Sequence, residues 1–159
     1  MPDVYSTDTF RFKIRSRVRM SQTDIVGIVN NIRYFEFMEL GRFEYFRDMG
    51  FHYGDLSSYR VAMTILESSC RYLSPLYFDE NIDIYVRVDY LGRSSFHVKY
   101  LVEVPERKVI VAEGRTVSVF IDPESRKPIE IPEDLRRLII DYEGKENISF
   151  KENKAPSSA

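Results

Sequence analysis

Apolar and basic residues alternate near the start of the chain. Between Phe10 and Met20 the even positions are apolar apart from Ser16, and the odd positions are all basic: Arg11, Lys13, Arg15, Arg17 and Arg19. A period of two predicts a strand with one face in the core and the other exposed. The basic face is either solvated or an anion-binding strip, and the pattern does not distinguish these alternatives.

A helical pattern follows, from about Asn31 to Met49. Asn30 or Asn31 can cap the first turn, and Gly50 closes the last one. The charged side is narrow, and apolar residues cover most of the remaining circumference: Ile32, Tyr34, Phe35, Met38, Phe43, Tyr45, Phe46 and Met49. This arc is wider than an ordinary amphipathic stripe, so we expect a curved sheet or a second chain to cover it.

Three residues in this helix stand out. Glu39 and Arg42 interrupt the apolar arc, and they are three apart, a spacing at which side chains on a helix meet. We therefore expect them to form an ion pair inside the protein or at an interface. Gly41 is unfavourable inside a helix, and it predicts the close approach of a neighbouring backbone.

Four further strands are predicted after the loop that follows the helix. They cover residues 59–72, 82–90, 96–104 and 108–121, and the turn 91–95 makes the second and third a hairpin or close neighbours. A short helix is predicted from Pro132 to about Tyr142. Strands in succession after one helix are typical of an antiparallel α+β domain with the helix on one sheet face. We expect one domain over residues 1–143 and a disordered polar tail over residues 144–159.

The composition is that of a folded globular protein, with 43% hydrophobic, 14% aromatic and 30% charged residues. A net charge of −2 gives no sign of nucleic-acid binding. The single cysteine, Cys70, excludes an internal disulfide and favours a reducing compartment. No apolar run reaches the roughly 20 residues that cross a bilayer, and the first ten residues do not resemble a signal peptide. We therefore expect a cytoplasmic protein that does not contact the membrane.

The residue inventory argues against several kinds of site. His52 and His97 have no cysteine or acidic partner at metal-ligand spacing, and the chain has neither a glycine-rich phosphate loop nor a G-x-S-x-G turn. A metal site, an ATP site and a serine-hydrolase mechanism are therefore not expected. His97 lies on the polar phase of its strand and is expected to face solvent, whereas His52 is a loop residue.

Asp24 lies between the first strand and the start of the long helix, in the stretch SQTDIVGIVNN. Gly27 follows three residues later and permits an unusual backbone angle. A helix N-terminus offers unpaired N–H donors to a carbonyl oxygen that becomes an oxyanion. A carboxylate beside such donors can catalyse acyl transfer, either by attacking a carbonyl or by activating water. The alternative is that Asp24 only forms the turn or caps the helix.

The stretch RVRMSQTDIVGIVNNIRYFEFMELGR resembles the signature of the 4-hydroxybenzoyl-CoA thioesterase family, a branch of the hotdog-fold superfamily. The matching positions are Thr23, Asp24, Gly27, Val29, Asn30, Asn31, Tyr34, Glu39 and Arg42. Weaker likeness extends over residues 10–143. The resemblance implies a long central helix wrapped by a five- or six-stranded antiparallel sheet. It also implies sheets paired side by side in a homodimer or homotetramer, with active sites at the subunit interface.

The resemblance also implies roles for particular residues. Asp24 would be the catalytic nucleophile or general base, and the backbone amide of Asn31 would contribute to the oxyanion hole. Gly27, Asn30 and Tyr34 would support the loop and the helix start. Five further residues are implied to bind the substrate. Arg93, Ser94 and Ser95 would contact CoA or shape the thioester site, and Arg126 and Lys127 would meet the CoA phosphates.

The implied activity is that of an acyl-CoA thioesterase without a metal or cofactor, because CoA is part of the substrate. A thioesterase acting on acyl carrier protein and a noncatalytic acyl-CoA-binding protein are the alternatives. The chain departs from the family pattern at Ser21 and Gln22, where an acid is common, and at Ile28, where histidine is common. One subgroup also has histidine in place of Asn31. These departures concern the helper residues and the substrate rather than the carboxylate.

Overall fold

Five antiparallel strands form a single sheet in the computed structural model, which describes residues 5–150. The strand order is β1-β3-β4-β5-β2. The strand bounds are β1 Phe12–Arg17, β2 Ala62–Tyr72, β3 Asn81–Leu91, β4 Ser95–Val104 and β5 Val109–Ile121. The helices are α1 Tyr34–Asp48 and α2 Glu133–Glu143, with short 3-10 turns at Met20–Gln22, Asn31–Arg33, Tyr53–Ser57 and Lys145–Asn147.

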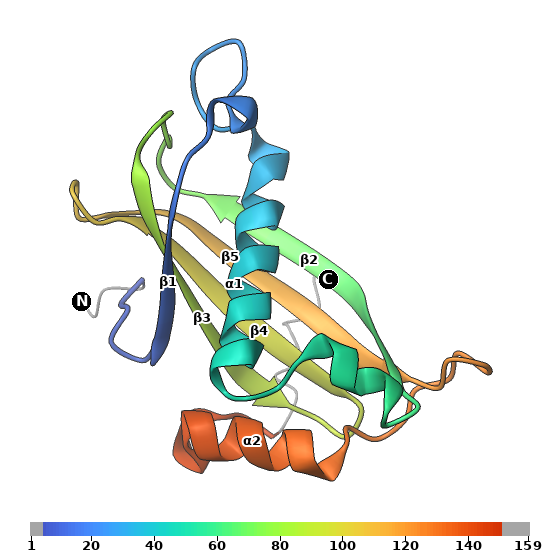
Figure 1. The fold of residues 1–159 in the computed structure, drawn as a ribbon. Coiled ribbons are helices and arrows are strands. Elements are labelled where there is room, and N and C mark those ends of the chain that lie inside the picture. The colour runs from blue at the N-terminus through green and yellow to red at the C-terminus, as the bar shows by residue number, and fades with distance from the viewer. Residues whose placement is uncertain (1–4, 151–159) are drawn as a thin grey trace, which may run out of the picture.

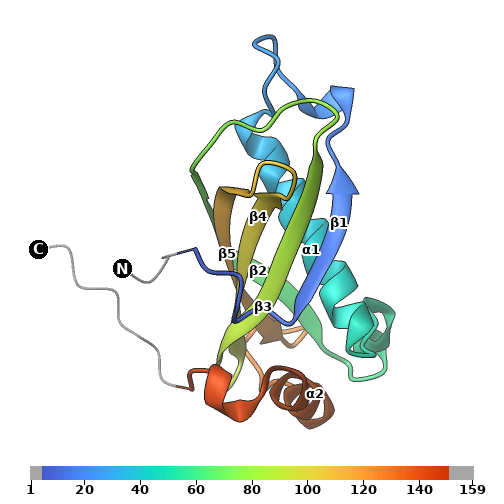
Figure 2. The same ribbon diagram turned by 90° about the vertical axis from the view of Figure 1, so that its left-hand side faces the viewer.

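The long helix α1 lies across one face of the sheet, and α2 lies at one end of it (Figure 1 and Figure 2). Strands β3, β4 and β5 are consecutive neighbours because short turns join them, whereas β1 and β2 form the two edges. The predicted antiparallel α+β domain with five strands is therefore confirmed. Within the described residues, no helix combines the length and the hydropathy needed to cross a membrane.

Strand β1 shows the expected alternation. Phe12, Ile14 and Ser16 are half-buried, and the basic residues between them are exposed. Part of the basic face is paired: Lys13 and Arg15 both contact the Asp83 carboxylate, at 3.0 and 2.8 Å. The strand ends at Arg17 because the chain then turns into the 3-10 segment that leads to Asp24.

Helix α1 buries one broad side against the sheet. Phe37, Met38, Tyr45 and Phe46 are almost fully buried, at spacings that place them on one face. Gly41 lies at the closest approach: a Cβ atom there would be 2.8 Å from the Cγ2 methyl groups of two β3 residues, Ile84 and Val86. The close approach is confirmed, but the neighbours are side chains rather than a backbone.

The sheet does not cover the whole apolar arc. Leu40 and Phe43 are each 37% exposed, and Ile32 at the helix start is 61% exposed. The expected Glu39–Arg42 ion pair is wrong. Arg42 turns inward, where it donates to the Tyr100 hydroxyl at 3.1 Å, and Glu39 stays at the surface. The reason is that a tertiary partner on β4 supplies an acceptor that the helix pattern does not reveal.

Ordered structure continues beyond residue 143. Glu143 is buried, and its carboxylate accepts a hydrogen bond of 2.6 Å from the Tyr45 hydroxyl of α1. Ile148 is also buried, and Ser149 pairs with β3 beside Tyr90. The prediction that disorder begins at residue 144 is therefore wrong for residues 144–150. These residues make contacts with the sheet that the composition does not predict. Residues 151–159 of the expected tail lie outside the described residues.

His97 is buried, although its place in the polar phase of its strand predicts that it faces solvent. Its ring lies 4.4 Å from the Tyr90 ring, and its Nδ1 atom contacts the Arg115 guanidinium. Tyr90 is also where the segment around Ser149 pairs with the sheet. The polar face of β4 is thus partly covered, which the alternation of residues within one strand cannot show.

Candidate active site

Asp24 organises the loop between β1 and α1. Its backbone N–H donates to the Ile28 carbonyl at 2.8 Å, and one carboxylate oxygen, Oδ1, accepts from the Val26 N–H at 2.8 Å. Gly27 donates to the Asp24 carbonyl and has a φ of 87°, a backbone angle that favours glycine. Within residues 5–150 the second carboxylate oxygen makes no hydrogen bond. Asp24 therefore forms the turn with one carboxylate oxygen and leaves the other without a hydrogen bond among the described residues.

The loop is tied to the rest of the fold on both sides. Val29 donates to the Leu76 carbonyl at 2.8 Å, and Asn30 donates to the Gln22 carbonyl at 2.9 Å. Gln22 is buried, and its side chain bonds to the Arg19 backbone and to Glu36. Gln22, which stands where the family commonly has an acid, thus supports the loop through its side-chain amide.

The first turn before α1 leaves one backbone donor without a protein acceptor. The Asn30 side chain caps the turn, accepting from the Ile32 N–H at 3.1 Å, as predicted. Asn31 begins the 3-10 turn, so its N–H has no partner inside the helix, and it bonds to no acceptor within residues 5–150. This donor is available to a ligand.

A cavity of about 380 Å³ brings the two groups together. Its walls come from the Asp24 loop, the helix start and the segment that follows β2: Asp24, Ile28, Val29, Asn31, Tyr34, Tyr72, Leu73, Ser74, Pro75 and Leu76. Three of the predicted catalytic residues, Asp24, Asn31 and Tyr34, therefore line one cavity. Gly27 and Asn30 do not line it and instead shape the loop and cap the turn.

Tyr34 and Tyr72 form an aromatic wall of this cavity. Their rings meet edge to face with centroids 5.0 Å apart. Tyr34 is 4% exposed, and burial raises the pKa of its phenol to about 12, so it stays protonated at neutral pH. Sequence reasoning missed Tyr72, because only the sheet order places the end of β2 opposite the helix start.

The five predicted CoA-binding residues lie elsewhere in the chain. Arg93 and Ser94 lie in the β3–β4 turn and Ser95 begins β4, at the α2 end of the sheet, whereas the Asp24 loop lies at the opposite end (Figure 1). Arg93 pairs with Glu130, and the Ser94 carbonyl accepts from the Phe120 N–H. Arg126 and Lys127 are in the turn after β5. Within one chain, the fold does not bring these residues to the cavity.

The other candidate side chains, His52 and Cys70, do not line this cavity. His52 lines a separate small hollow beside Phe43 and Tyr53. Burial raises the pKa of the Cys70 thiol to about 11, which disfavours the thiolate. Over the described residues, no three His, Cys, Asp or Glu side chains are grouped so that they could hold a metal ion.

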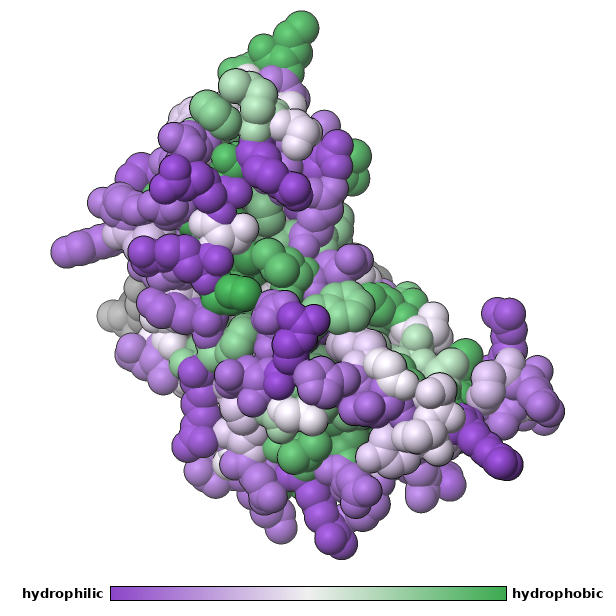
Figure 3. Space-filling model, in the orientation of Figure 1, coloured by the Kyte–Doolittle hydropathy of each residue, from purple (hydrophilic) through white to green (hydrophobic). Residues whose placement is uncertain are grey.

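The tip of the Asp24 loop is apolar and exposed. Ile25 and Val26 are 103% and 77% exposed. Figure 3 shows this hydrophobic tip at the top of the molecule, above a largely polar surface. The candidate carboxylate thus lies at the base of an exposed apolar projection.

Comparisons with known proteins point to one family. A family model described as "Thioesterase-like superfamily" matches residues 18–139. The acyl-CoA thioester hydrolase YbgC of Escherichia coli O6:H1 (strain CFT073) is 26% identical over 131 residues, which are 82% of this chain and 95% of that protein.

Two solved structures extend the similarity to the fold. A hypothetical protein from Aquifex aeolicus has a TM-score of 0.74 at 27% identity, over 80% of this chain and 98% of that one. A thioesterase from Thermus thermophilus, complexed with coenzyme A and Zn, has a TM-score of 0.75 at 28% identity, over 86% of this chain and 97% of that one. Both share the arrangement described above over nearly their full length.

Proposed function

This chain belongs to the thioesterase-like superfamily, with the expected hotdog fold, and we propose that it hydrolyses an acyl-CoA thioester to a carboxylic acid and free CoA. One observation carries the proposal. Asp24 and Asn31 line the same cavity, and within residues 5–150 neither the second Asp24 carboxylate oxygen nor the Asn31 N–H makes a hydrogen bond. A carboxylate beside a helix-start donor is a minimal apparatus for acyl transfer.

In the proposed reaction the thioester carbonyl oxygen lies near the Asn31 N–H. Asp24 either attacks the carbonyl carbon or takes a proton from the water that attacks it. Negative charge then develops on the carbonyl oxygen, where the Asn31 amide stabilises it. Collapse breaks the C–S bond, and the CoA thiolate leaves and is protonated. Where Asp24 itself attacked, water then hydrolyses the mixed anhydride between Asp24 and the acyl group, which releases the carboxylic acid and restores the carboxylate. Water is the only co-reactant, so the proposal includes no metal or cofactor.

The test is release of free thiol from a panel of acyl-CoA esters that differ in chain length and in aromatic or aliphatic character. The same acyl groups on acyl carrier protein form the second arm. Turnover of the carrier-protein esters that equals or exceeds that of the CoA esters would reassign the substrate. Binding of CoA esters without thiol release, in the wild type and in Asp24→Asn alike, would show a noncatalytic binding protein.

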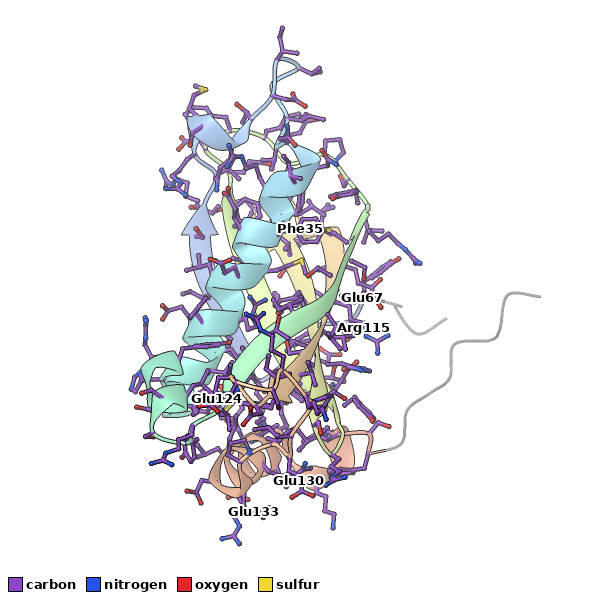
Figure 4. All side chains as sticks on the ribbon, turned by 90° about the vertical axis from the view of Figure 1, so that its right-hand side faces the viewer. Phe35, Glu67, Arg115, Glu124, Glu130 and Glu133 are labelled. Carbon is purple, nitrogen blue, oxygen red and sulfur yellow. The ribbon has the colours of Figure 1, made fainter. Side chains whose placement is uncertain are left out.

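We also propose that the active form is a homodimer or a tetramer built from it. Strand β2 is an edge of the sheet, so one side of its backbone is unpaired, and edge strands readily add a further strand. Leu66 at the bulge in β2 is 65% exposed, and Ile65 is 38% exposed. Figure 4 looks onto this side and labels Glu67 on β2 and Phe35 on α1.

A dimer could bring the predicted CoA-binding residues of one subunit close to the Asp24 cavity of the other. An antiparallel second copy, paired along β2, would turn its α2 end toward the Asp24 loop of the first. The residues equivalent to Arg93, Ser94, Ser95, Arg126 and Lys127 would then approach the cavity from the other subunit. The cationic side chains among them, Arg93, Arg126 and Lys127, suit the phosphates of CoA.

Leu66→Lys is expected to shift the protein toward monomers, because a lysine there places a charge in the proposed apolar contact. Light scattering after size-exclusion chromatography measures the change. Leu40→Lys is the matched control, since Leu40 is also exposed but lines the hollow between α1 and β1. A Leu66→Lys protein with the mass of the wild type would contradict the β2 interface.

A further inference from the structure

Tyr72, the last residue of β2, joins the sheet edge to the helix start. Its hydroxyl donates to the Asn31 carbonyl at 2.8 Å, and its side chain lines the cavity with Asp24 and Asn31. We propose that Tyr72 is a positioning residue, whose hydroxyl holds the first helical turn so that the Asn31 amide meets the developing oxyanion. This inference rests on the proposed function.

The hydrogen bonds around Asn31 show what Tyr72 adds. The Asn30 carbonyl accepts from the Arg33 N–H at 2.9 Å, and the Asn30 side chain accepts from the Ile32 N–H. The Asn30 N–H itself donates to the Gln22 carbonyl. These bonds all lie within residues 22–33. Among the described residues, only Tyr72 reaches this turn from the sheet with a hydrogen bond, and it lies 41 residues away in the chain.

The orientation of a backbone donor depends on the peptide groups on both sides of it. The Asn31 N–H belongs to the peptide whose carbonyl is held by Arg33, and the next peptide carbonyl is the one held by Tyr72. Losing the second anchor frees a rotation at Asn31 in a turn of only three residues. An oxyanion donor is effective only when it is aligned before the reaction, so this freedom would reduce transition-state stabilisation.

The contact requires a tyrosine in its protonated form. A phenylalanine would keep the edge-to-face packing on Tyr34 but would lose the donor. Partial burial is the main cause that raises the pKa of Tyr72 above its ordinary value of 10, and the nearby Cys70 thiol is a second cause. The hydroxyl therefore stays protonated at neutral pH and can donate to the Asn31 carbonyl.

The decisive variant is Tyr72→Phe in the full chain, with Tyr59→Phe as the control. Tyr59 is exposed to a similar degree, 37% against 45%, and does not line the cavity. Tyr72→Phe is expected to lower kcat for acyl-CoA hydrolysis by about tenfold, with KM changed by less than about twofold, because the lost bond acts on the transition state. Tyr59→Phe is expected to leave both constants unchanged.

A second readout does not depend on activity. The carbonyl 13C resonance of Asn31 is expected to shift in Tyr72→Phe and to stay in place in Tyr59→Phe, since only the first substitution removes its hydrogen bond. An unchanged resonance would overturn the inference, as would a wild-type kcat. A fall in stability with kcat retained in the folded fraction would also overturn it, because that outcome marks a merely structural contact. A wild type inactive on every thioester would refute the proposed function instead, while the resonance still reports the contact.

Discussion

Asp24→Asn is expected to lower kcat for acyl-CoA hydrolysis by about a thousandfold. Asparagine keeps the Oδ1 atom that accepts from the Val26 N–H, so the loop should retain its turn. It loses the negative charge that either attacks the thioester or takes a proton from water. Substrate binding should persist, because the cavity walls are unchanged. Steady-state thiol release and equilibrium binding of an acyl-CoA measure the two effects separately.

The matched control for this substitution is Asp55→Asn. Asp55 also uses a carboxylate oxygen to accept a backbone N–H, that of His52 at 3.2 Å, but it lies in the turn after α1, outside the Asp24 cavity. We expect this variant to keep wild-type activity. If Asp24→Asn also retained activity within a few-fold, Asp24 would be a turn residue and the proposed mechanism would fail.

Gly41→Val is expected to lower the free energy of unfolding by about 2–3 kcal/mol. A Cβ atom at this position would lie 2.8 Å from methyl groups of Ile84 and Val86, which are themselves fully buried. Valine suits a helix slightly better than glycine, but by less than about 1 kcal/mol, so overpacking outweighs this gain. Chemical denaturation followed by circular dichroism measures the change.

Gly54→Val serves as the control for added volume. A Cβ atom at Gly54 meets no heavy atom within 4 Å, and we expect a change within about 1 kcal/mol there. A Gly41→Val protein as stable as the wild type would mean that α1 and β3 can separate without cost. That outcome would contradict the close packing of the helix on the sheet.

The sequence predicted most elements because their causes are local. The alternation around Ile14 marks one face of β1, and Asn30 caps the turn that begins the helical region. Both features depend on residues within a few positions of each other. The contribution of Asp24 and Gly27 to the loop is equally local, since their hydrogen bonds span two to four residues. Whether Asp24 is catalytic stays a prediction.

Partners that are distant in the chain were the source of the errors. Arg42 was expected to pair with Glu39, but its partner Tyr100 is 58 residues away. His97 was expected to face solvent, but it lies against Tyr90 and Arg115 on neighbouring strands. A helical wheel or a strand phase ranks neighbours within one element, so it cannot identify contacts that depend on which elements are adjacent.

By itself the sequence determined the kinds of element, their order and the presence of a carboxylate loop before the long helix, because short-range backbone preferences encode these features. Only the tertiary structure decided that the end of β2 faces the helix start, so that Tyr72 joins Asn31 and Asp24 in one cavity. It also decided that the predicted CoA-binding residues lie at the other end of the sheet. The physical reason is that both placements depend on the order of the strands in the sheet. That order arises from packing the whole core rather than from any one segment.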